Sequence, residues 1–386
     1  MTSMPRRVLV ARGGAISSLS GLGRAHHDLV LHLRHGDIKG WELAGEIDHP
    51  TGGSPLPRLW RRWRSHPRKV ARRVSELVAS GQVDLLHISD QEQAILVPHN
   101  SLIPVAVTVH DLFHLDPQII ESPEGKITVG EQYPGRVRKR DLEKIRAGLG
   151  RADLLICDSR TTQEHAERLF PDSRTIVVPL GIDTTARNPH LSPQPRPESL
   201  PSDRLNLLII GSEEPRKRLL FAIDVLSALG EDIRGDVVLH KVGAESDSIP
   251  SLRLQSQSAR AGVEMNWLGA VSEVELIALE QHADALLFPS VAEGFGYPPL
   301  EAMAAGCPVL MSDLGSHNEL AIPGTPLPPF EIGAWVAALH EIHSEWVERS
   351  KSTRASHEKG IEQARKFSSS VFSDNMSAAY ESLFSS

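Results

Sequence analysis

Short apolar runs recur along the chain, each bounded by Gly, Asp or Pro and followed by a longer segment with helical spacing. Continuous apolar runs of this length indicate strands that are buried on both faces. Because these runs alternate with helical segments, the pattern predicts α/β domains with parallel sheets. The predicted strands are residues 8–11, 84–88, 104–109, 153–157, 175–178, 205–210, 236–242, 285–288 and 308–311.

A proline-rich stretch at residues 186–203 separates these strands into two series. Proline is excluded from helix interiors and central strands, so we expect this stretch to be a linker. The sequence therefore predicts two doubly wound, Rossmann-like domains at 1–185 and 204–365, facing each other across a cleft. Residues 366–386 are expected to form a helix that returns toward the first domain. Paired domains of this kind bind ligands at the carboxyl ends of their strands.

Composition and charge exclude several classes of protein. The 386 residues carry a net charge of −8, which argues against a nucleic-acid partner. Two distant cysteines, Cys157 and Cys307, provide neither a disulfide framework nor a zinc site, and they favour a reducing cytoplasm. No apolar run reaches the roughly 18 residues of a membrane span. We expect a cytoplasmic protein.

The most informative segment is 284–319, in which a strand pattern leads into a glycine-containing loop and then into a helix that begins with two prolines. Unpaired backbone amides at such a helix start suit a bound diphosphate, as does the positive end of the helix dipole. Glycines allow the backbone to approach a ligand closely. The residues expected to contact the ligand are Gly294, Phe295, Gly296, Tyr297 and Pro298.

Two acids flank this helix start. Glu301 is expected in the first helical turn, where a carboxylate can accept hydrogen bonds from a ribose diol. Glu293 lies on the preceding loop, facing the group attached beyond the phosphates. The alternative is that Glu301 complements the helix dipole and that Glu293 is a solvated loop acid.

The whole segment, P-S-x-x-E-G-F-G-x-P-x-L-E-A-M-A-x-G-x-P-V, resembles the E-x7-E signature of retaining nucleotide-sugar glycosyltransferases. In particular it resembles glycosyltransferase family four, whose members have the GT-B fold. The resemblance implies a nucleoside-diphosphate-sugar donor and two Rossmann-like domains. It implies no metal and no other cofactor.

Residues 211–217 (GSEEPRK) resemble the glycine turn and basic pair with which the family grips the diphosphate. Arg216 and Lys217 would neutralise the phosphate charge, including the charge that develops on the leaving group. Many members carry Arg directly after the glycine, where this chain has Ser212, so Arg216 is expected to supply that charge. Taken alone, the pair is also compatible with an exposed basic helix start.

Three further features follow the family's order. Gly21 and Gly23 precede a predicted helix and resemble its N-terminal glycine loop. Residues 267–273, which include Val271, resemble the loop that cradles the base. His110 ends a predicted buried strand, and the family has a histidine there that contacts the sugar or the acceptor. For a histidine taken alone, a structural hydrogen-bonding role is the alternative.

Together these features imply a retaining glycosyltransferase whose catalytic residues are Glu293, His110 and Lys217. Its product would be a glycan, polysaccharide or glycolipid, made on a glycan, lipid-linked or small-molecule acceptor. The His-Asp pair at 110–111 and the Arg-Lys pair at 216–217 resemble those of mannosyl- and related hexosyltransferases of polysaccharide assembly. This resemblance implies a hexose donor and favours mannose. A catalytically silent sugar-nucleotide-binding subunit is one alternative, and a nucleotide-sugar epimerase or hydrolase on the same fold is another.

The segment from Arg58 to Arg73 contains eight basic residues, two tryptophans and no acid. Solvated surface charge is the ordinary explanation of such a run. The combination of Trp and Arg also suits the headgroup region of a membrane, and it suits an anionic acceptor. The sequence therefore predicts peripheral contact with the inner face of the membrane as an alternative, although Pro67 is expected to break any long helix here.

Overall fold

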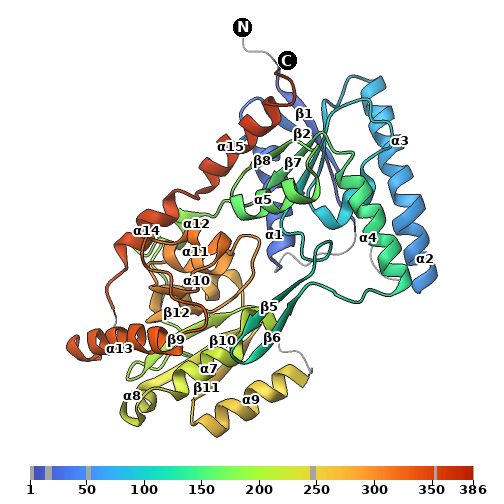
Figure 1. The fold of residues 1–386 in the computed structure, drawn as a ribbon. Helices are drawn as coiled ribbons and strands as arrows, with labels where there is room; N and C mark the ends of the chain where they lie inside the picture. Colours follow the sequence, from blue (N-terminus) through green and yellow to red (C-terminus); the bar gives the residue numbers. More distant parts are fainter. Residues whose placement is uncertain (1–3, 14–19, 49–53, 244–248, 352–353, 386) are drawn as a thin grey trace. The chain divides into compact units, whose positions relative to one another are not determined.

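The computed structural model describes residues 4–13, 20–48, 54–243, 249–351 and 354–385 (Figure 1). The chain divides into two compact units, and each contains one parallel sheet. The first unit comprises residues 1–118, 130–181 and 369–386, and the second comprises 119–129 and 182–368. The second unit thus includes the proline-rich stretch and a hairpin that is inserted in the first half of the sequence.

The first unit is built on a six-stranded parallel sheet with the order β2-β1-β3-β4-β7-β8. Its central strands are apolar and fully buried, as expected of parallel strands covered on both faces. The strands are β1 (Arg6–Ala11), β2 (Trp41–Ile47), β3 (Leu85–Ile88), β4 (Val105–Val109), β7 (Leu154–Cys157) and β8 (Thr175–Val177).

Helices cover both faces of this sheet. Helices α3 (His66–Ala79) and α4 (Arg136–Leu149) place Val70 and Ile145 in the same buried cluster as Leu86 of β3. The next residue, His87, faces the opposite side. There it contacts helix α15 (Ser369–Glu381) through the Tyr380 hydroxyl, 2.5 Å from His87 Nδ1. The C-terminal helix is therefore part of the first unit. The other helices of this unit are α1 (Gly21–His35), α2 (Pro55–Trp60) and α5 (Arg160–Leu169).

The second unit contains a five-stranded parallel sheet with the order β11-β10-β9-β12-β13. Its strands are β9 (Leu205–Ile210), β10 (Val237–Val242), β11 (Met265–Gly269), β12 (Ala285–Phe288) and β13 (Val309–Met311). Alternate residues of β9 face two separate apolar clusters. Leu207 packs with Phe221 and Trp335, whereas Leu208 packs with Leu279 and Ala302. These clusters bring helices to both faces of the sheet.

The helices of the second unit are α6 (Thr184–Arg187), α7 (Leu219–Ser227), α8 (Glu231–Asp236), α9 (Ile249–Ala261), α10 (Glu273–His282), α11 (Tyr297–Ala304), α12 (Gly315–Leu320), α13 (Ile332–Glu348) and α14 (Glu358–Arg365). All nine predicted strands are confirmed, and so is the prediction of two Rossmann-like sheets. Strands β2 and β11 and the hairpin β5 (Gln118–Ser122) and β6 (Gly125–Val129) were not predicted.

The prediction that Pro67 breaks the helix of the basic segment is wrong. The chain is helical from α2 through Arg61–Ser65, which forms a π-helical turn, and on through α3. The His66 amide bonds to the Arg61 carbonyl, five residues back. Pro67 lies at the start of α3, where its missing N–H is tolerated. No helix in the described part of the chain is long and apolar enough to cross a membrane.

Candidate active site

The loop between β12 and α11 ends at Gly296, whose φ of 117° favours glycine. A Cβ there would lie 3.2 Å from the Leu320 Cδ1 atom. Helix α11 begins at Tyr297 with prolines in its first turn, as predicted. Pro298 and its neighbour Pro299 have no N–H. Only the other amides of this turn can therefore donate hydrogen bonds.

Glu293, on this loop, forms an ion-paired cluster with the basic pair. Lys217 Nζ lies 3.0 Å from Glu293 Oε1, and Arg216 Nη1 lies 2.6 Å from Oε2. The Ser290 hydroxyl donates to Oε1 at 2.9 Å. The three charged side chains are only 11–18% exposed. The fold thus brings together two segments that lie 76 residues apart in the sequence.

The electrostatics of this cluster keep Glu293 ionised. Burial acts to raise the pKa of Glu293, but Lys217 and Arg216 outweigh it and hold that pKa at about 2. The pKa of Arg216 is raised, because Glu293 and Glu214 more than offset the effect of burial. The site therefore presents one ionised carboxylate beside two basic side chains. Such a set can neutralise a diphosphate and stabilise a developing positive charge.

The loop after β9 is locked to the loop after β12. Arg216 Nη1 donates to the Ala292 carbonyl at 2.7 Å, and the Val291 amide donates to the Arg216 carbonyl at 2.8 Å. Gly211, at the end of β9, has a φ of 135°, and a Cβ there would lie 3.3 Å from Lys217 Nζ. A side chain at position 211 would therefore disturb the cation.

The structure adds residues to this site that sequence reasoning missed. The Ser316 hydroxyl donates to the Glu293 carbonyl at 2.9 Å, so helix α12 supports the loop. The His317 ring packs on Phe288 at 5.1 Å, and burial lowers its pKa although Glu293 acts to raise it. Neither residue has a recognisable spacing from Glu293. In the sequence, Ser316 and His317 are indicated only by being a serine and a histidine at the start of a helix.

Glu301 lies in the second turn of α11, rather than in the first as predicted, because the helix begins at Tyr297. Its side chain is 5% exposed, and its Oε1 atom lies 2.6 Å from Arg187 Nη2. Arg187 was not expected at the site, since it lies 114 residues earlier in the chain.

His110 follows β4, as predicted, and is held inside the first unit by both ring nitrogens. Nδ1 lies 2.6 Å from Asp158 Oδ2, and Nε2 lies 3.1 Å from the Ser89 carbonyl. Burial acts to lower the pKa of His110, but Asp158 and Asp90 outweigh it and raise that pKa to about 9. His110 is therefore an imidazolium at neutral pH. Asp158, the residue after β7, is its charge partner.

The remaining residues predicted to contact the donor are Gly21, Gly23 and Val271, and they lie at or near the ends of helices and strands. Gly21 and Gly23 do not precede the helix as predicted but lie in the first turn of α1, because the helix begins at Gly21. There the Ser20 hydroxyl accepts a bond from the Gly23 amide at 3.1 Å. Val271 lies in the loop between β11 and α10 and is half-buried. It packs on the cluster around Leu279.

A buried lysine, Lys241, lies on β10, the strand that neighbours β9 in the sheet. Lys241 of β10 is fully buried, its Nζ atom lies 3.5 Å from Glu213 Oε1, and it stands 5.5 Å from the centre of the Trp267 ring. The pair ties the loop that carries Arg216 to the neighbouring strand. One lysine within a largely apolar strand does not indicate, from the sequence alone, that it forms this ion pair.

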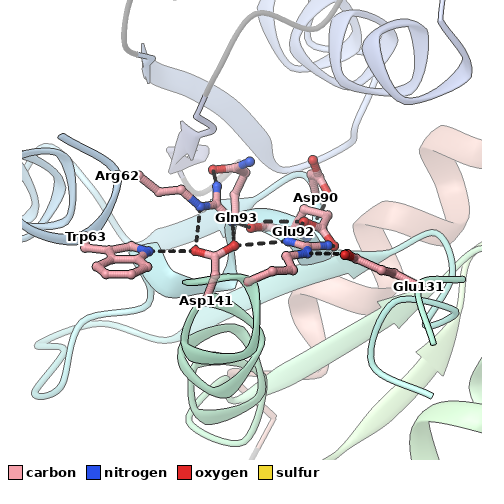
Figure 2. Close-up of polar contacts among 8 residues, drawn as sticks. Arg62, Trp63, Asp90, Glu92, Gln93, Glu131 and Asp141 are labelled. Atoms are coloured by element: carbon pink, nitrogen blue, oxygen red, sulfur yellow. Dashed lines mark hydrogen bonds and ion pairs between the residues drawn. The ribbon is translucent and has the colours of Figure 1, made fainter. Parts of the chain in front are cut away.

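The basic segment does not face solvent throughout (Figure 2). Arg62 Nε lies 2.7 Å from Asp141 Oδ1 of α4, and the Trp63 indole donates to the same oxygen at 2.7 Å. Arg138 joins the cluster through Asp141 and Glu92, each at 3.0 Å. Burial raises the pKa of Asp141, but Arg62, Trp63 and Arg138 outweigh it and lower that pKa. Arg62 is thus a structural residue.

A groove of about 570 Å³ lies between α3, α4 and residues 95–99. Its floor is apolar and its rim is basic. The residues that line it are Trp63, Arg64, Pro67, Arg68, Ala71, Ile95, Leu96, Val97, Pro98, His99, Arg140, Glu143, Lys144, Ala147 and Arg151. Within the described chain, Arg64, Arg68, Arg140 and Lys144 have no ion-pair partner. Trp60, one turn before the groove, is 62% exposed.

Two solved structures superpose on nearly the whole of this chain. Sucrose-phosphate synthase from Thermosynechococcus elongatus superposes with a TM-score of 0.72 at 18% identity, covering 98% of this chain and 99% of that one. HepE from Anabaena, solved in complex with UDP, gives a TM-score of 0.67 at 16% identity, covering 98% and 100%. The chain therefore has the GT-B fold.

Each half of the chain also matches a family model. The model described as Glycosyltransferase Family 4 matches residues 19–186, and the model described as Glycosyl transferases group 1 matches residues 193–366. The two matches lie one in each half of the chain and together span most of it.

Curated relatives match about half of the chain. Phosphatidyl-myo-inositol mannosyltransferase of Mycobacterium leprae is 28% identical over 57% of this chain and 56% of its own length. Glycogen synthase of Mycobacterium tuberculosis is 28% identical over 53% and 49%. The chain spans about half the length of the curated relatives it matches.

Proposed function

We propose that the protein is a retaining glycosyltransferase that moves a hexose from a nucleoside-diphosphate sugar to a hydroxyl acceptor. The observation that carries the proposal is the buried cluster of Glu293, Arg216 and Lys217. Two cations beside the start of α11 suit the diphosphate and its developing charge. The carboxylate, held ionised, suits the positive charge that develops at the anomeric carbon.

The other predicted residues have complementary roles in this proposal. Glu301 binds the ribose, and the amides around Tyr297 contribute to the diphosphate site. His110, a cation at neutral pH, contacts the sugar near the acceptor hydroxyl. Its ring nitrogens are both engaged without ligand, so this role requires it to exchange the Ser89 carbonyl for the substrate. No metal is needed for any of these steps.

Mannose is the hexose we propose. Two of the relatives are described as mannosyltransferases. One is the Mycobacterium leprae enzyme, and the other is RfbU of Salmonella typhimurium, which is 39% identical over 20% of this chain and 22% of its own length. GDP-mannose is therefore the first donor to test, with UDP-, ADP- and dTDP-sugars beside it. The donor that binds will raise the melting temperature by mass action.

A transfer assay separates this proposal from its two alternatives. A silent binding subunit raises its melting temperature with a sugar nucleotide but releases no nucleoside diphosphate. An epimerase changes the donor sugar without releasing it, and a hydrolase releases the sugar to water. Only a transferase needs an acceptor for rapid release of the nucleoside diphosphate. Release that depends on acceptor therefore supports the proposal, and any other pattern contradicts it.

We further propose that the groove between α3 and α4 docks on an anionic lipid surface. Four basic side chains without ion-pair partners surround an apolar floor, and each cation near such a surface contributes about 1 kcal/mol. The exposed Trp60 is an amphipathic ring suited to headgroup depth. The Arg62–Asp141 cluster holds the helices on both sides of the groove (Figure 2).

Vesicle sedimentation tests this docking. Replacing Arg64, Arg68, Arg140 and Lys144 by glutamine should weaken binding to phosphatidylglycerol vesicles at least tenfold at low salt. A control removes the same charge outside the groove, at Arg72, Arg73, Arg136 and Lys139, and should have a much smaller effect. Neither set should bind phosphatidylcholine vesicles. Equal losses in the two sets would show that only net charge matters, and would contradict a docking groove.

A further inference from the structure

Three carboxylates converge on one buried guanidinium in the second unit. Arg187 is 1% exposed, and it contacts Glu280, Glu301 and Glu273. Nη1 lies 2.5 Å from Glu280 Oε2, and Nη2 lies 2.6 Å from Glu301 Oε1. Nη2 also contacts Glu273 Oε1. Of the three acids, Glu280 is fully buried and Glu273 is half exposed.

The position of Arg187 is fixed by its surroundings. It ends the one-turn helix α6, whose first amides are capped by Asp183 at 2.9 and 3.0 Å. Its own carbonyl accepts a bond from Gln281 Nε2 at 2.9 Å. The guanidinium therefore reaches α10 and α11 from a backbone that is held on both sides.

A buried pair made only for stability would be complete without Glu301. Glu280 alone supplies the one negative charge that Arg187 needs in a buried setting. Placing the carboxylate of Glu301 beside it adds a second buried acid, which is costly unless that acid has a further use. The planar guanidinium suits this arrangement, because its two terminal nitrogens hold different carboxylates at fixed positions.

We infer that Arg187 is a positioning residue for Glu301 and thereby sets the preference of the donor site for ribose over 2′-deoxyribose. The inference rests on the proposed function, in which Glu301 accepts hydrogen bonds from the ribose hydroxyls. A carboxylate has about four lone-pair positions and can accept hydrogen bonds from more than one donor. Arg187 keeps that carboxylate oriented.

Calorimetry with GDP and 2′-deoxy-GDP, and with UDP and 2′-deoxy-UDP, measures this preference directly. The wild type should bind the better ribonucleotide at least tenfold more tightly than its 2′-deoxy form, because a charge-assisted bond is lost. In Arg187→Lys the compact ammonium lacks the planar fork that holds different carboxylates at fixed positions, so the ratio should fall below about threefold. The affinity for the 2′-deoxy form should change little, since that ligand loses less from a misplaced Glu301.

A second variant guards against misfolding. Arg187→Met combined with Glu280→Met replaces the buried charge pair by apolar side chains of similar size, which proteins often tolerate. It leaves Glu301 without its cation and should also lose the ribose preference. The matched control is Arg349→Lys, because Arg349 pairs with the buried Asp284 of the same unit. The control should keep the wild-type ratio.

The outcomes separate the inference from the proposed function. If the wild type binds none of GDP, UDP, ADP and dTDP, the donor site itself is wrongly assigned, and the role of Arg187 falls with it. If the wild type prefers ribose and both Arg187 variants keep that preference, the donor site stands and the inference is overturned. Loss of the preference in both variants, with the control unchanged, supports the inference.

Discussion

Replacing Glu293 by glutamine separates the two roles of its cluster. In the structure without ligand, the carboxylate binds Lys217 and Arg216, which are the same cations that the diphosphate would use. Glutamine keeps the size of the side chain and one acceptor but removes the charge. The variant should therefore lose folding stability, gain affinity for a nucleoside diphosphate and lose turnover.

The size of the stability loss follows from the pKa of Glu293, which lies at about 2 instead of its ordinary 4.5. One pKa unit corresponds to about 1.4 kcal/mol, so the charge stabilises the fold by on the order of 3 kcal/mol. For a domain of this size the melting temperature should fall by roughly 5–10 °C. Because the pKa is depressed, this stabilisation is present above pH 4.5 and is lost as the pH falls toward 2.

Scanning calorimetry of both proteins at pH 7.5 and at pH 3 measures the stability difference, which should shrink at the lower pH. The matched control is Glu214→Gln, which removes a carboxylate from the exposed side of Arg216 and should cost about 1 kcal/mol or less. Titration with GDP and UDP measures affinity, and release of nucleoside diphosphate measures turnover. Turnover should fall about 100-fold or more.

Two results would refute this reasoning. A Glu293→Gln protein that melts like the wild type at pH 7.5 would show that the ion-paired cluster does not exist in solution. A variant that transfers sugar at the wild-type rate would show that the carboxylate does not stabilise the transition state. Weaker binding of the nucleoside diphosphate would contradict competition for the two cations.

Three further substitutions test the rest of the site. Glu301→Ala should weaken nucleoside-diphosphate binding by roughly 10–100-fold, measured by calorimetry, because the ribose loses a charged acceptor. Lys217→Ala should lower kcat at least 100-fold, and Arg216→Ala somewhat less, in steady-state assays of the leaving diphosphate. Asp158→Asn should lower the pKa of His110 from about 9, seen by NMR titration. Because that pKa is raised, the stability it contributes is complete below pH 6.5 and is lost as the pH rises through 9; melting curves of the variant should therefore change less over this range.

The sequence was sufficient for the interior strands and for the edge strands β8 and β13, but not for the edge strands β2 and β11. All nine predicted strands are continuous apolar runs, and burial on both faces leaves few other choices for such runs. The missed β2 (WELAGEI) and β11 (MNWLG) are edge strands of their sheets and carry polar or half-exposed residues. The hairpin at 118–129 has polar and apolar residues on short strands, so its pattern is weak.

The site shows the same division. Loop motifs identified Arg216, Lys217 and Glu293, because glycine and proline spacing marks the ends of strands and the starts of helices. The partners that orient other residues were missed: Arg187 for Glu301, Asp158 for His110, and Asp141 for Arg62. These pairs lie 114, 48 and 79 residues apart, and only the packing of separate elements brings them together. Charge pairing across such separations has no local pattern.

Donor consumption followed by NMR tests the central claim most directly. Wild-type protein and Lys217→Ala are incubated with GDP-mannose, UDP-glucose, ADP-glucose and dTDP-glucose and a panel of hydroxyl acceptors. The account predicts that the wild type consumes at least one donor, with an acceptor, and that the product keeps the anomeric configuration of the donor sugar. Lys217→Ala should do so at least 100-fold more slowly. A product of inverted configuration, or a wild type that neither binds nor consumes any of the four donors, would contradict the account.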